Sequence, residues 1–463
     1  MSDKLEVLKY YLYYKYRRPF VSRKQLENWQ NRRLSDHIAY VSGHSAIYRG
    51  KERMEEFPVI DKTFMMEHFN ELNTVGIDRD QAMEFAVWAE RERNFTPKLK
   101  GTTVGLSSGT SGRRGIFLVS DDEKNRWAGY ILARFLPGGI FKTYSIAFFM
   151  RADSNLYQAV SSKNIQFHFF DIYKDMEEHR ERLESIRPRI LAGQPSLLLM
   201  LANAMDRGEL QIRPQVVISI AEVLEKEDES RLKNAFGLPV IHQVYQCTEG
   251  CLASTCRCGT LHLNEDIVYI EKEYLDEKRF VPVVTDFERK AQPIIRYRLN
   301  DILVERSGTC PCGSPFTALE KIEGREDDVF VFRGADGSMV SVFPDFIRRC
   351  VLFAVGSEKQ EISPSAFGSE VGELGTENDR RKMDVGGVCS SDYRIVQENG
   401  DITIYSDLTE SEKDRVRKEF EKLAKDRGFI LPKLTFTAYF WEKDRKMKRV
   451  ERKGQTGDTY EEP

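Results

Sequence analysis

The feature that most constrains the fold is a regular alternation of two kinds of segment between about residues 100 and 245. Short runs of β-branched and aromatic residues alternate with longer, charged stretches of helical pattern. The apolar runs are SIAFFM, FHFFDI, PQVVISI and PVIHQVY, and the charged stretches include EEHRERLESIRP and EKEDESRLKNAF. Strands separated by helices of this length predict a parallel sheet with crossover helices.

The pattern changes on both sides of this region. Residues 1–100 are mainly helical in pattern, and strand-like segments after Glu249 predict a more antiparallel region. Beyond EGREDD, the chain offers a hairpin candidate, DYRIVQENGDITIYSD, and an amphipathic helix that ends in glycine, SEKDRVRKEFEKLAKDRG. We therefore predict a large α/β domain over residues 1–325 and a small α+β domain over 326–463. Residues 355–388, rich in Gly, Ser and charge, are expected to form a loop without its own core.

Composition narrows the class of protein. Of the 463 residues, 41% are hydrophobic and 31% charged, which is typical of a globular protein, and the net charge of -3 gives no reason to expect a nucleic acid partner. No apolar run approaches the ~20 residues that span a bilayer. The N-terminus lacks the apolar core of a signal peptide, so a cytoplasmic location is expected. Its tyrosine stripe and basic end favour a packed amphipathic helix over a membrane-surface contact.

A glycine-rich loop, GLSSGTSGRRG (105–115), is the strongest local signal. Small residues let backbone N–H groups approach phosphate oxygens, and the hydroxyls add donors. A nucleotide-triphosphatase loop would end in Gly-Lys-Ser/Thr, but Arg113 follows Gly112 here. Residues 105–109 also satisfy the G-x-S-x-G nucleophile elbow, which must turn from a strand into a helix, whereas this loop continues into a second strand pattern. A glycine-rich hairpin turn that binds nothing is the remaining alternative.

Four further motifs follow this loop. They are Ala221-Glu222, the segment YQCTE (245–249), the segment RYRLND (296–301) and the segment GREDD (324–328). In this order and at these distances, the five motifs resemble the adenylate-forming superfamily of acyl- and aryl-CoA ligases over residues 100–330. The segments FPVIDKTFMMEHFNELNT, AGQPSLL and LHLNED look like the phenylacetate-CoA ligase branch, with its capsule-biosynthesis relatives.

The resemblance implies an ATP site and a catalytic pair. The residues implied to bind ATP are Ser107, Ser108, Gly109, Thr110, Ser111, Gly112, Ala221, Glu222, Tyr245, Gln246, Asp301 and Arg325. Loop amides and hydroxyls would cradle the phosphates, Tyr245 would stack on adenine, and Asp301 would accept hydrogen bonds from both ribose hydroxyls. Glu249, beside Thr248, would hold Mg²⁺ where negative charge accumulates as a carboxylate attacks the α-phosphate.

The implied reaction is ATP-dependent activation of a carboxylic acid as an acyl-adenylate, with release of pyrophosphate. Transfer to coenzyme A would follow. The alternatives are another acceptor (a carrier protein, an amine or a cofactor) or a nucleotide-binding module without catalysis. We expect the acid near residues 141–160 and 192–196, with Phe148, Phe149 and Arg151 as candidates. A homodimer is compatible with these expectations.

The C-terminal domain is expected to be mobile. In the superfamily it rotates between the two half-reactions, and Asp327 matches the hinge position. The superfamily also places a lysine near the C-terminus that reaches the adenylation site. Lys446, three residues before Arg449, fits that spacing; Lys448 is the rival, and a solvated basic tail is the third interpretation.

Two Cys-x-Cys pairs suggest a metal site. Cys256 and Cys258 precede one glycine, and Cys310 and Cys312 precede another. Four thiolates in two short pairs can form a tetrahedral structural Zn²⁺ site, with free buried thiols and a redox pair as alternatives. The resemblance to this branch implies a structural zinc at this place, because its members carry one here. A histidine in the LH segment can serve as a ligand in them, so His262 is a rival for one of the four positions.

Overall fold

The structure is a computed structural model and describes residues 3–107, 114–150, 161–172, 174–356, 393–440 and 447–453. It divides into two compact units, Met1–Ile322 and Glu323–Pro463, which we describe separately. The sequence predicts the boundary at residue 325, close to this division. Most of the loop predicted at 355–388 lies outside the described residues.

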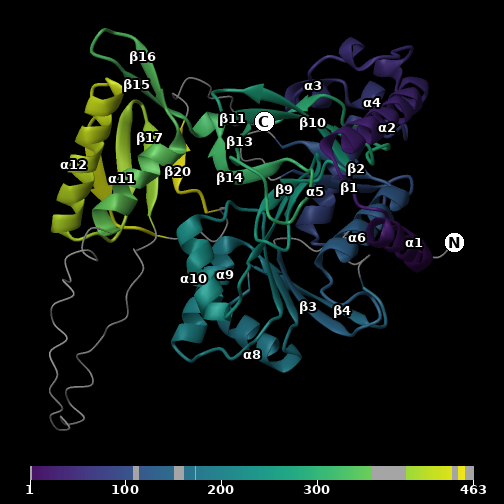
Figure 1. Cartoon of the computed structure of the whole chain (residues 1–463), viewed down its shortest axis with the longest axis horizontal. Coiled ribbons are helices and arrows are strands. Elements are labelled where there is room, and N and C mark those ends of the chain that lie inside the picture. The colour runs from purple at the N-terminus through teal and green to yellow at the C-terminus, as the bar shows by residue number, and fades with distance from the viewer. Residues whose placement is uncertain are drawn as a thin grey trace. The chain divides into compact units, whose positions relative to one another are not determined.

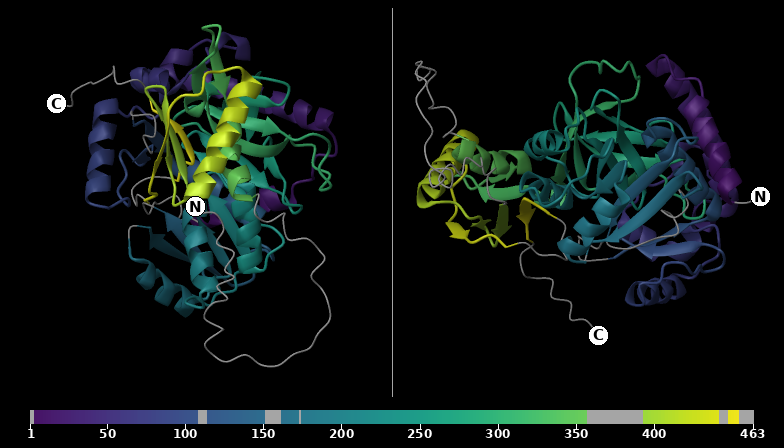
Figure 2. Two further views of the ribbon diagram at one scale, coloured as in Figure 1. Left: turned by 90° about the vertical axis from the view of Figure 1, so that its left-hand side faces the viewer. Right: turned by 90° about the horizontal axis from the view of Figure 1, so that it is seen from below.

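The N-terminal third of the first unit is helical. Its α-helices are α1 (Asp3–Tyr16), α2 (Arg23–His44), α3 (Lys62–Glu67), α4 (Phe69–Leu72), α5 (Arg79–Arg91) and α6 (Asp121–Phe135), with 3₁₀ turns at η1 (Ala46–Tyr48) and η2 (Met54–Glu56). Helix α1 packs along α6 and lies at the edge of the unit in the right-hand view of Figure 2. Within the described residues, no helix has the length and apolarity that crossing a membrane requires.

A 12-stranded mixed sheet forms the centre of the first unit. Its members are β3 (Tyr144–Met150), β4 (Ile165–Asp171), β5 (Ile190–Gly193), β6 (Val216–Ile220), β7 (His242–Cys247), β8 (Gly250–Thr255), β9 (Leu261–Leu263), β10 (Val268–Tyr274), β11 (Arg279–Asp286), β12 (Tyr297–Arg298), β13 (Asp301–Glu305) and β14 (Ala318–Arg325). Strands β4, β3, β5, β6 and β7 are parallel neighbours, and from β8 onward the pairing is antiparallel. This confirms the predicted parallel region and its change after residue 249.

Helices cover both faces of the parallel strands, as such sheets require. Helices α8 (Met176–Ile186), α9 (Pro195–Asp206) and α10 (Lys226–Phe236) lie against one face of these strands (Figure 1). They bury Leu183, Leu198 and Leu232 in a cluster with Phe149. The opposite face packs against α1, α2 and α6. Because side chains alternate along a strand, Ile146 and Phe148 of β3 face this second cluster while Ala147 and Phe149 face the first.

A separate two-stranded sheet flanks the glycine-rich loop. Strands β1 (Thr103–Leu106) and β2 (Ile116–Val119) pair antiparallel, with Leu106 opposite Ile116. The loop therefore connects two strands of a hairpin. A nucleophile elbow needs a strand-to-helix turn, so the hydrolase alternative is excluded on topology.

The second unit has its own core. A four-stranded sheet in the order β19, β18, β17, β20 and a β15–β16 hairpin pack with α11 and α12. The elements are η3 (Glu326–Asp328), β15 (Phe330–Arg333), β16 (Met339–Val342), α11 (Pro344–Gly356), β17 (Arg394–Glu398), β18 (Asp401–Tyr405), α12 (Glu410–Arg427), β19 (Leu434–Thr437) and β20 (Val450–Arg452). The predicted hairpin is β17–β18, whose turn places Asn399 and Gly400 at φ of 52° and 91°. The predicted amphipathic helix is α12, which Thr409 caps and Gly428 ends at φ 74°.

Candidate functional site

The carboxyl ends of the parallel strands carry the central motifs. Strand β6 leads into Ala221-Glu222, and neighbouring β7 leads into Thr248-Glu249. The β7–β8 register shifts between Tyr245 and Gln246, and such irregularities redirect side chains at the end of a strand. Open α/β sheets bind ligands outside the carboxyl ends of their strands. Both motifs therefore lie at the edge where a ligand is expected.

Tyr245 and Asp301 meet although 56 residues separate them. The Tyr245 phenol donates a hydrogen bond of 2.5 Å to Asp301 Oδ2. Burial, followed by the negative charge of Asp301, raises the pKa of Tyr245 well above its ordinary value, so the phenol stays protonated and donates. The sequence predicts adenine contact for the first residue and ribose contact for the second, and the structure brings the two into contact.

Glu249 faces a second tyrosine. The Tyr297 side chain is hydrogen-bonded to Glu249, and burial together with the charge of this carboxylate raises the pKa of Tyr297. The same carboxylate contributes, after burial, to the raised pKa of Cys247, whose thiol lies 3.7 Å from the Gly250 carbonyl. Glu249 therefore accepts a hydrogen bond in a half-buried turn, residues 248–250, which we call the corner. The neighbouring phenol of Tyr297 and thiol of Cys247 both remain neutral.

The other residues at this edge have specific protein contacts. Ala221 adopts a left-handed conformation with φ of 66°, which turns the chain sharply after β6. Glu222 Oε2 accepts from the Ser196 hydroxyl at 2.9 Å and from the Ser196 amide at 3.3 Å, at the start of α9. Gln246 Oε1 accepts from the indole N–H of Trp127 at 3.0 Å. Ribose and adenine contacts for these residues stay predictions.

The base of the glycine-rich loop is closed by Ser107. Its amide donates to the Gly115 carbonyl at 2.7 Å, and its hydroxyl accepts from the Gly115 amide at 2.8 Å. Arg114 donates to the Ser107 carbonyl and forms two hydrogen bonds with Glu90, at 2.6 and 2.5 Å. Ser108, Gly109, Thr110, Ser111 and Gly112 lie outside the described residues. The phosphate-binding role of this loop therefore stays a prediction.

Two predicted residues belong to the C-terminal unit. Arg325 is half-buried and immediately precedes the 3₁₀ turn η3. Lys446 lies outside the described residues. Its rival Lys448 forms an ion pair of 2.6 Å with the buried carboxylate of Asp328, at the end of η3. In this structure, the Lys448 ammonium is thus engaged within its own unit.

Four of the five predicted metal ligands form one cluster. The ligand atoms of Cys256, His262, Cys310 and Cys312 all lie within 4.8 Å of one another. Cys256 Sγ is 3.8 Å from Cys310 Sγ, and Cys312 Sγ is 3.5 Å from His262 Nε2. Tetrahedral zinc, with bonds of about 2.3 Å to sulfur and about 2.05 Å to nitrogen, would require separations of about 3.8 and about 3.6 Å. The residues therefore fit Zn²⁺.

Neighbouring groups influence the tautomer of His262 and the pKa of Cys310. His262 Nδ1 lies 3.0 Å from the Phe316 carbonyl, which favours the tautomer that leaves Nε2 as the metal-facing acceptor. Burial acts to raise the pKa of Cys310, but hydrogen bonds from Thr260, the Cys312 backbone and His262 outweigh it and lower the pKa to about 6. Burial raises the pKa of the neighbouring Cys256 to about 11, so Cys310 is the one of these two thiols that forms the metal-binding thiolate near neutral pH.

Cys258 is not part of this cluster. It is exposed, and its contribution to the turn is a backbone amide that donates to Cys256 Sγ at 3.3 Å. Ser314 makes the matching contact to Cys312 Sγ at 3.4 Å. The tight turn, which Gly259 allows at φ of 81°, directs the Cys258 amide rather than its thiol to the cluster. Of the two residues that compete for one position, His262 lies in the cluster and Cys258 lies outside it, and metal binding by the cluster stays a prediction.

Comparisons with known proteins bear on the fold of the chain. No family model matches the chain. Indoleacetate–lysine synthetase of Pseudomonas savastanoi is 27% identical over 235 residues, which are 46% of this chain and 56% of the synthetase. The chain thus spans about half the length of this curated relative.

Solved structures match over a larger share. One is a crystal structure of 2-hydroxyisobutyryl-CoA ligase in the postadenylation state, in complex with 2-HIB-AMP. Its TM-score is 0.60 at 16% sequence identity, and the match covers 92% of this chain and 89% of the ligase chain. An open conformation of the same ligase, with 2-HIB-AMP and CoA, has a TM-score of 0.57 at 16% identity and covers 94% and 93%. This chain has the fold of the adenylate-forming ligases. The fold that the resemblance implies is therefore confirmed.

Within this adenylate-forming fold, the predicted acid pocket is only partly described. Phe148 faces the α6 side of the sheet, with its ring 5.4 Å from that of Phe167. Phe149 is fully buried on the other face and stacks on Phe170 at 4.5 Å. Arg151 lies outside the described residues. Phe148 is therefore the better candidate of the two phenylalanines, and Phe149 is a core residue.

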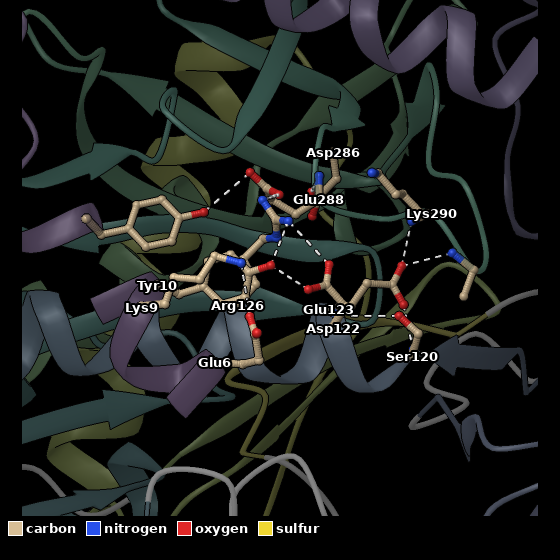
Figure 3. Close-up of polar contacts among 12 residues, drawn as sticks. Glu6, Lys9, Tyr10, Ser120, Asp122, Glu123, Arg126, Asp286, Glu288 and Lys290 are labelled. Atoms are coloured by element: carbon tan, nitrogen blue, oxygen red, sulfur yellow. Dashed lines mark hydrogen bonds and ion pairs between the residues drawn. The ribbon is translucent and has the colours of Figure 1, made fainter. Parts of the chain in front are cut away.

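The sequence analysis missed a group of residues in the segment 286–292. Arg289 and Gln292 are buried and contact β2, and Arg289 also contacts Thr248. Figure 3 shows the neighbouring polar network around Glu123, Arg126 and Glu288. In the sequence, FERKAQP resembles an ordinary charged turn. The one available signal was Ser120-x-x-Glu123, a capping-box pattern that predicts a helix start but no contact with the distant segment.

Proposed function

We propose that this chain activates a carboxylic acid with ATP, forms an acyl-adenylate and releases pyrophosphate. The observation that carries the proposal is the meeting of Tyr245 with Asp301, and of Glu249 with Tyr297, at the carboxyl end of β7. These pairs join two segments that are distant in sequence, 245–249 and 296–301, at the edge where α/β sheets bind ligands. The adenylate-forming fold supports the same reaction.

Each residue has a physical task in this proposal. Asp301 offers two carboxylate oxygens to the ribose hydroxyls, and Tyr245 supplies an aromatic face to adenine. Glu249 would hold Mg²⁺, since a carboxylate that accepts a phenol hydrogen bond keeps further lone pairs for a metal. Bound Mg²⁺ would neutralise phosphate charge as the acid attacks. Lys446 would bridge the acid carboxylate and the α-phosphate, as its spacing from Arg449 suggests.

Two acceptors for the acyl group have support. The matched ligase is described in complex with CoA, so coenzyme A is the first candidate. The curated relative is named as a synthetase of indoleacetate and lysine, so an amine is the second. The same name makes an aryl acid such as indoleacetate a sensible first substrate to test.

We also propose that Cys256, His262, Cys310 and Cys312 hold a structural Zn²⁺. The ligand separations above support a closed tetrahedral site that stabilises the fold rather than takes part in the reaction. The described cysteines are free thiols, which supports a cytoplasmic location. A homodimer remains compatible with the proposal.

Acid-dependent exchange of pyrophosphate into ATP tests the reaction. Aryl acids, including indoleacetate and phenylacetate, should be compared with short aliphatic acids. We expect exchange with at least one acid and none without acid. Adding CoA or lysine and analysing the product by mass spectrometry then distinguishes a thioester from an amide. If Mg²⁺-ATP binds but no acid supports exchange, the nucleotide-binding module is the correct alternative.

A further inference from the structure

A buried arginine, Arg289, links the turn that carries Glu249 to strand β2, which follows the glycine-rich loop. Arg289 is 9% exposed. Its Nη1 donates to the Thr248 carbonyl at 2.8 Å, and its Nη2 donates to the Leu118 carbonyl at 3.0 Å. Thr248 precedes Glu249, and Leu118 lies in β2, the strand that follows the glycine-rich loop. One guanidinium therefore joins the proposed metal-binding corner to the proposed phosphate-binding hairpin.

The hairpin needs this support because β2 has a strand on one side only. Leu118 pairs with Val104 of β1, and its outward backbone groups meet side chains instead of a third strand. The Leu118 amide donates to Gln292 Oε1 at 2.9 Å, its carbonyl accepts from Arg289, and Gln292 Nε2 donates to the Ile116 carbonyl at 3.1 Å. The hydrogen bonds of Gln292 described here go to the hairpin. Those of Arg289 go both to the hairpin and to Thr248, beside Glu249.

Arg289 is itself held rigidly by the turn that carries it. Asp286 Oδ1 accepts from the Glu288 amide at 2.8 Å. Glu123 Oε1 accepts from the amides of Lys290 and Ala291 at 2.5 and 2.9 Å, so the residues on both sides of Arg289 are fixed. Figure 3 shows Glu123 reaching from α6 toward Lys290.

An ion-pair network anchors the same turn to the N-terminal helices. Glu288 accepts from Arg126 of α6 at 2.8 Å and from Arg33 of α2 at 3.1 Å. These groups are partly or largely buried, where charged hydrogen bonds are stronger than in water. The backbone that carries Arg289 is consequently anchored to helices α2 and α6.

The corner is also confined from its other side. A β-carbon added to Gly250 would lie 2.7 Å from Asp286 Oδ2, so the Asp286 carboxyl packs directly against this glycine. Thr248, Glu249 and Gly250 are thus enclosed between the Arg289 guanidinium and the Asp286 carboxyl, two side chains of one turn. A shift of this turn would move Glu249 relative to the hairpin.

We propose that Arg289 is a positioning residue that sets the distance between strand β2 and the turn that carries Glu249, and thereby the Mg²⁺ requirement of the proposed reaction. The inference rests on the proposed function. Arginine suits the task because its planar fork donates to two carbonyls in fixed directions, whereas lysine offers a compact charge on a flexible stem. Positioning of this kind affects metal-dependent steps more than binding of the acid.

The test compares Arg289→Lys with Gln292→Leu in the full chain. Arg289→Lys keeps the buried cation but cannot hold both carbonyls, while Gln292→Leu releases the hairpin and leaves the Thr248 contact in place. Three quantities are measured for each variant: ATP binding by calorimetry with and without Mg²⁺, the Mg²⁺ concentration at half-maximal pyrophosphate exchange, and the KM for the acid. Thermal unfolding of each variant reports any general loss of structure.

We expect Arg289→Lys to raise the half-saturating Mg²⁺ concentration about tenfold and to lower the exchange rate, with the KM for the acid unchanged. Gln292→Leu should weaken ATP binding with and without Mg²⁺ alike and leave the Mg²⁺ requirement as in the wild type. The inference is overturned if Arg289→Lys keeps the wild-type Mg²⁺ requirement, or if both variants shift it equally. The calorimetric comparison reports on Mg²⁺ and ATP without any acid, so it remains decisive even if no acid supports exchange and the proposed function fails.

Discussion

Glu249 is the carboxylate that we propose to hold Mg²⁺. It lies in the turn between two antiparallel strands, where a neutral phenol donates to it and a neutral thiol lies beside it. Burial and this carboxylate raise the pKa of both neighbours, so both stay neutral and place no further negative charge beside that of Glu249.

Replacing Glu249 with Gln keeps the size and one acceptor oxygen but removes this charge. We expect pyrophosphate exchange to fall by about 100-fold or more, while ATP binding without Mg²⁺ survives. Asp301→Ala is the matched contrast, since it should weaken ATP binding itself by removing the ribose acceptor. Calorimetry and exchange assays distinguish the two. Normal exchange in both variants would show that the motif assignment is wrong.

Asp286 predicts a pH dependence of stability. Burial raises its pKa to about 7, against the opposing effect of Arg289. The folded state then binds a proton between about pH 4 and 7 that the unfolded chain has released. The stability this provides is fully present below about pH 4 and is lost as the pH rises through 7, by at most about 1.4 kcal/mol per pH unit.

Asp286→Asn should remove that dependence, because the amide stays neutral at every pH and keeps an oxygen for the Glu288 amide. Urea unfolding at pH 5, 6, 7 and 8 measures the difference in the free energy of unfolding. Between pH 5 and 7, the wild type should lose stability relative to the variant. Parallel curves for the two proteins would show that the Asp286 carboxyl is ionised throughout this range.

At the level of elements, two tight turns bring together the cluster of Cys256, His262, Cys310 and Cys312. One turn follows β8 and carries Cys256, and the other precedes β14 and carries Cys310 and Cys312; β9 supplies His262. Gly259 and Gly313 have φ of 81° and 76°, and each turn directs a backbone amide to a ligand sulfur. A metal at this point would join two loops that contribute little apolar burial of their own.

Cys310→Ser should therefore act on stability. We expect loss of about one bound zinc per chain and a fall in thermal stability, with little change in ATP affinity. Cys258→Ser is the matched control, because this exposed thiol lies outside the cluster and its amide is unaffected. Metal analysis after gel filtration and thermal unfolding measure both effects. Equal zinc loss in the two variants would return Cys258 to the ligand set.

At the level of the whole molecule, the chain consists of two units, each with a core of its own. The C-terminal core gathers residues of β15, β17, β18, α11 and α12, together with Val450 of β20. Lys448 forms an ion pair with Asp328, near the start of this unit. The strand that follows Lys448, β20, pairs in parallel with β17. Rotation of this unit between the two half-reactions stays a prediction.

This arrangement separates the two candidate lysines. Lys448→Ala leaves the buried Asp328 carboxylate without its cation, so we expect the C-terminal unit to lose about 1–3 kcal/mol of stability. Lys446→Ala should instead lower the rate of pyrophosphate exchange with little change in ATP affinity, and should leave acyl transfer from a supplied acyl-adenylate nearly untouched. Normal exchange in Lys446→Ala, with loss in Lys448→Ala at unchanged stability, would assign the catalytic role to Lys448.

The sequence by itself determined those features that depend on neighbouring residues. The alternation of apolar runs and charged helices predicted the parallel strands, because a segment's period reflects the faces it buries. Asn399-Gly400 predicted a hairpin and Gly428 a helix end, since both reflect local backbone conformation. The ordered motifs also placed Tyr245 and Asp301 in one predicted site, and the two side chains are hydrogen-bonded in the structure.

Only the tertiary structure decided which groups meet across long stretches of chain. Nothing in FERKAQP indicates that Arg289 holds Thr248 and Leu118, because those carbonyls lie 41 and 171 residues away and are brought near by the packing of separate sheets. The exclusion of Cys258 has the same origin. Spacing in sequence places two thiols in one turn, but the backbone conformation of that turn determines which of them faces the cluster.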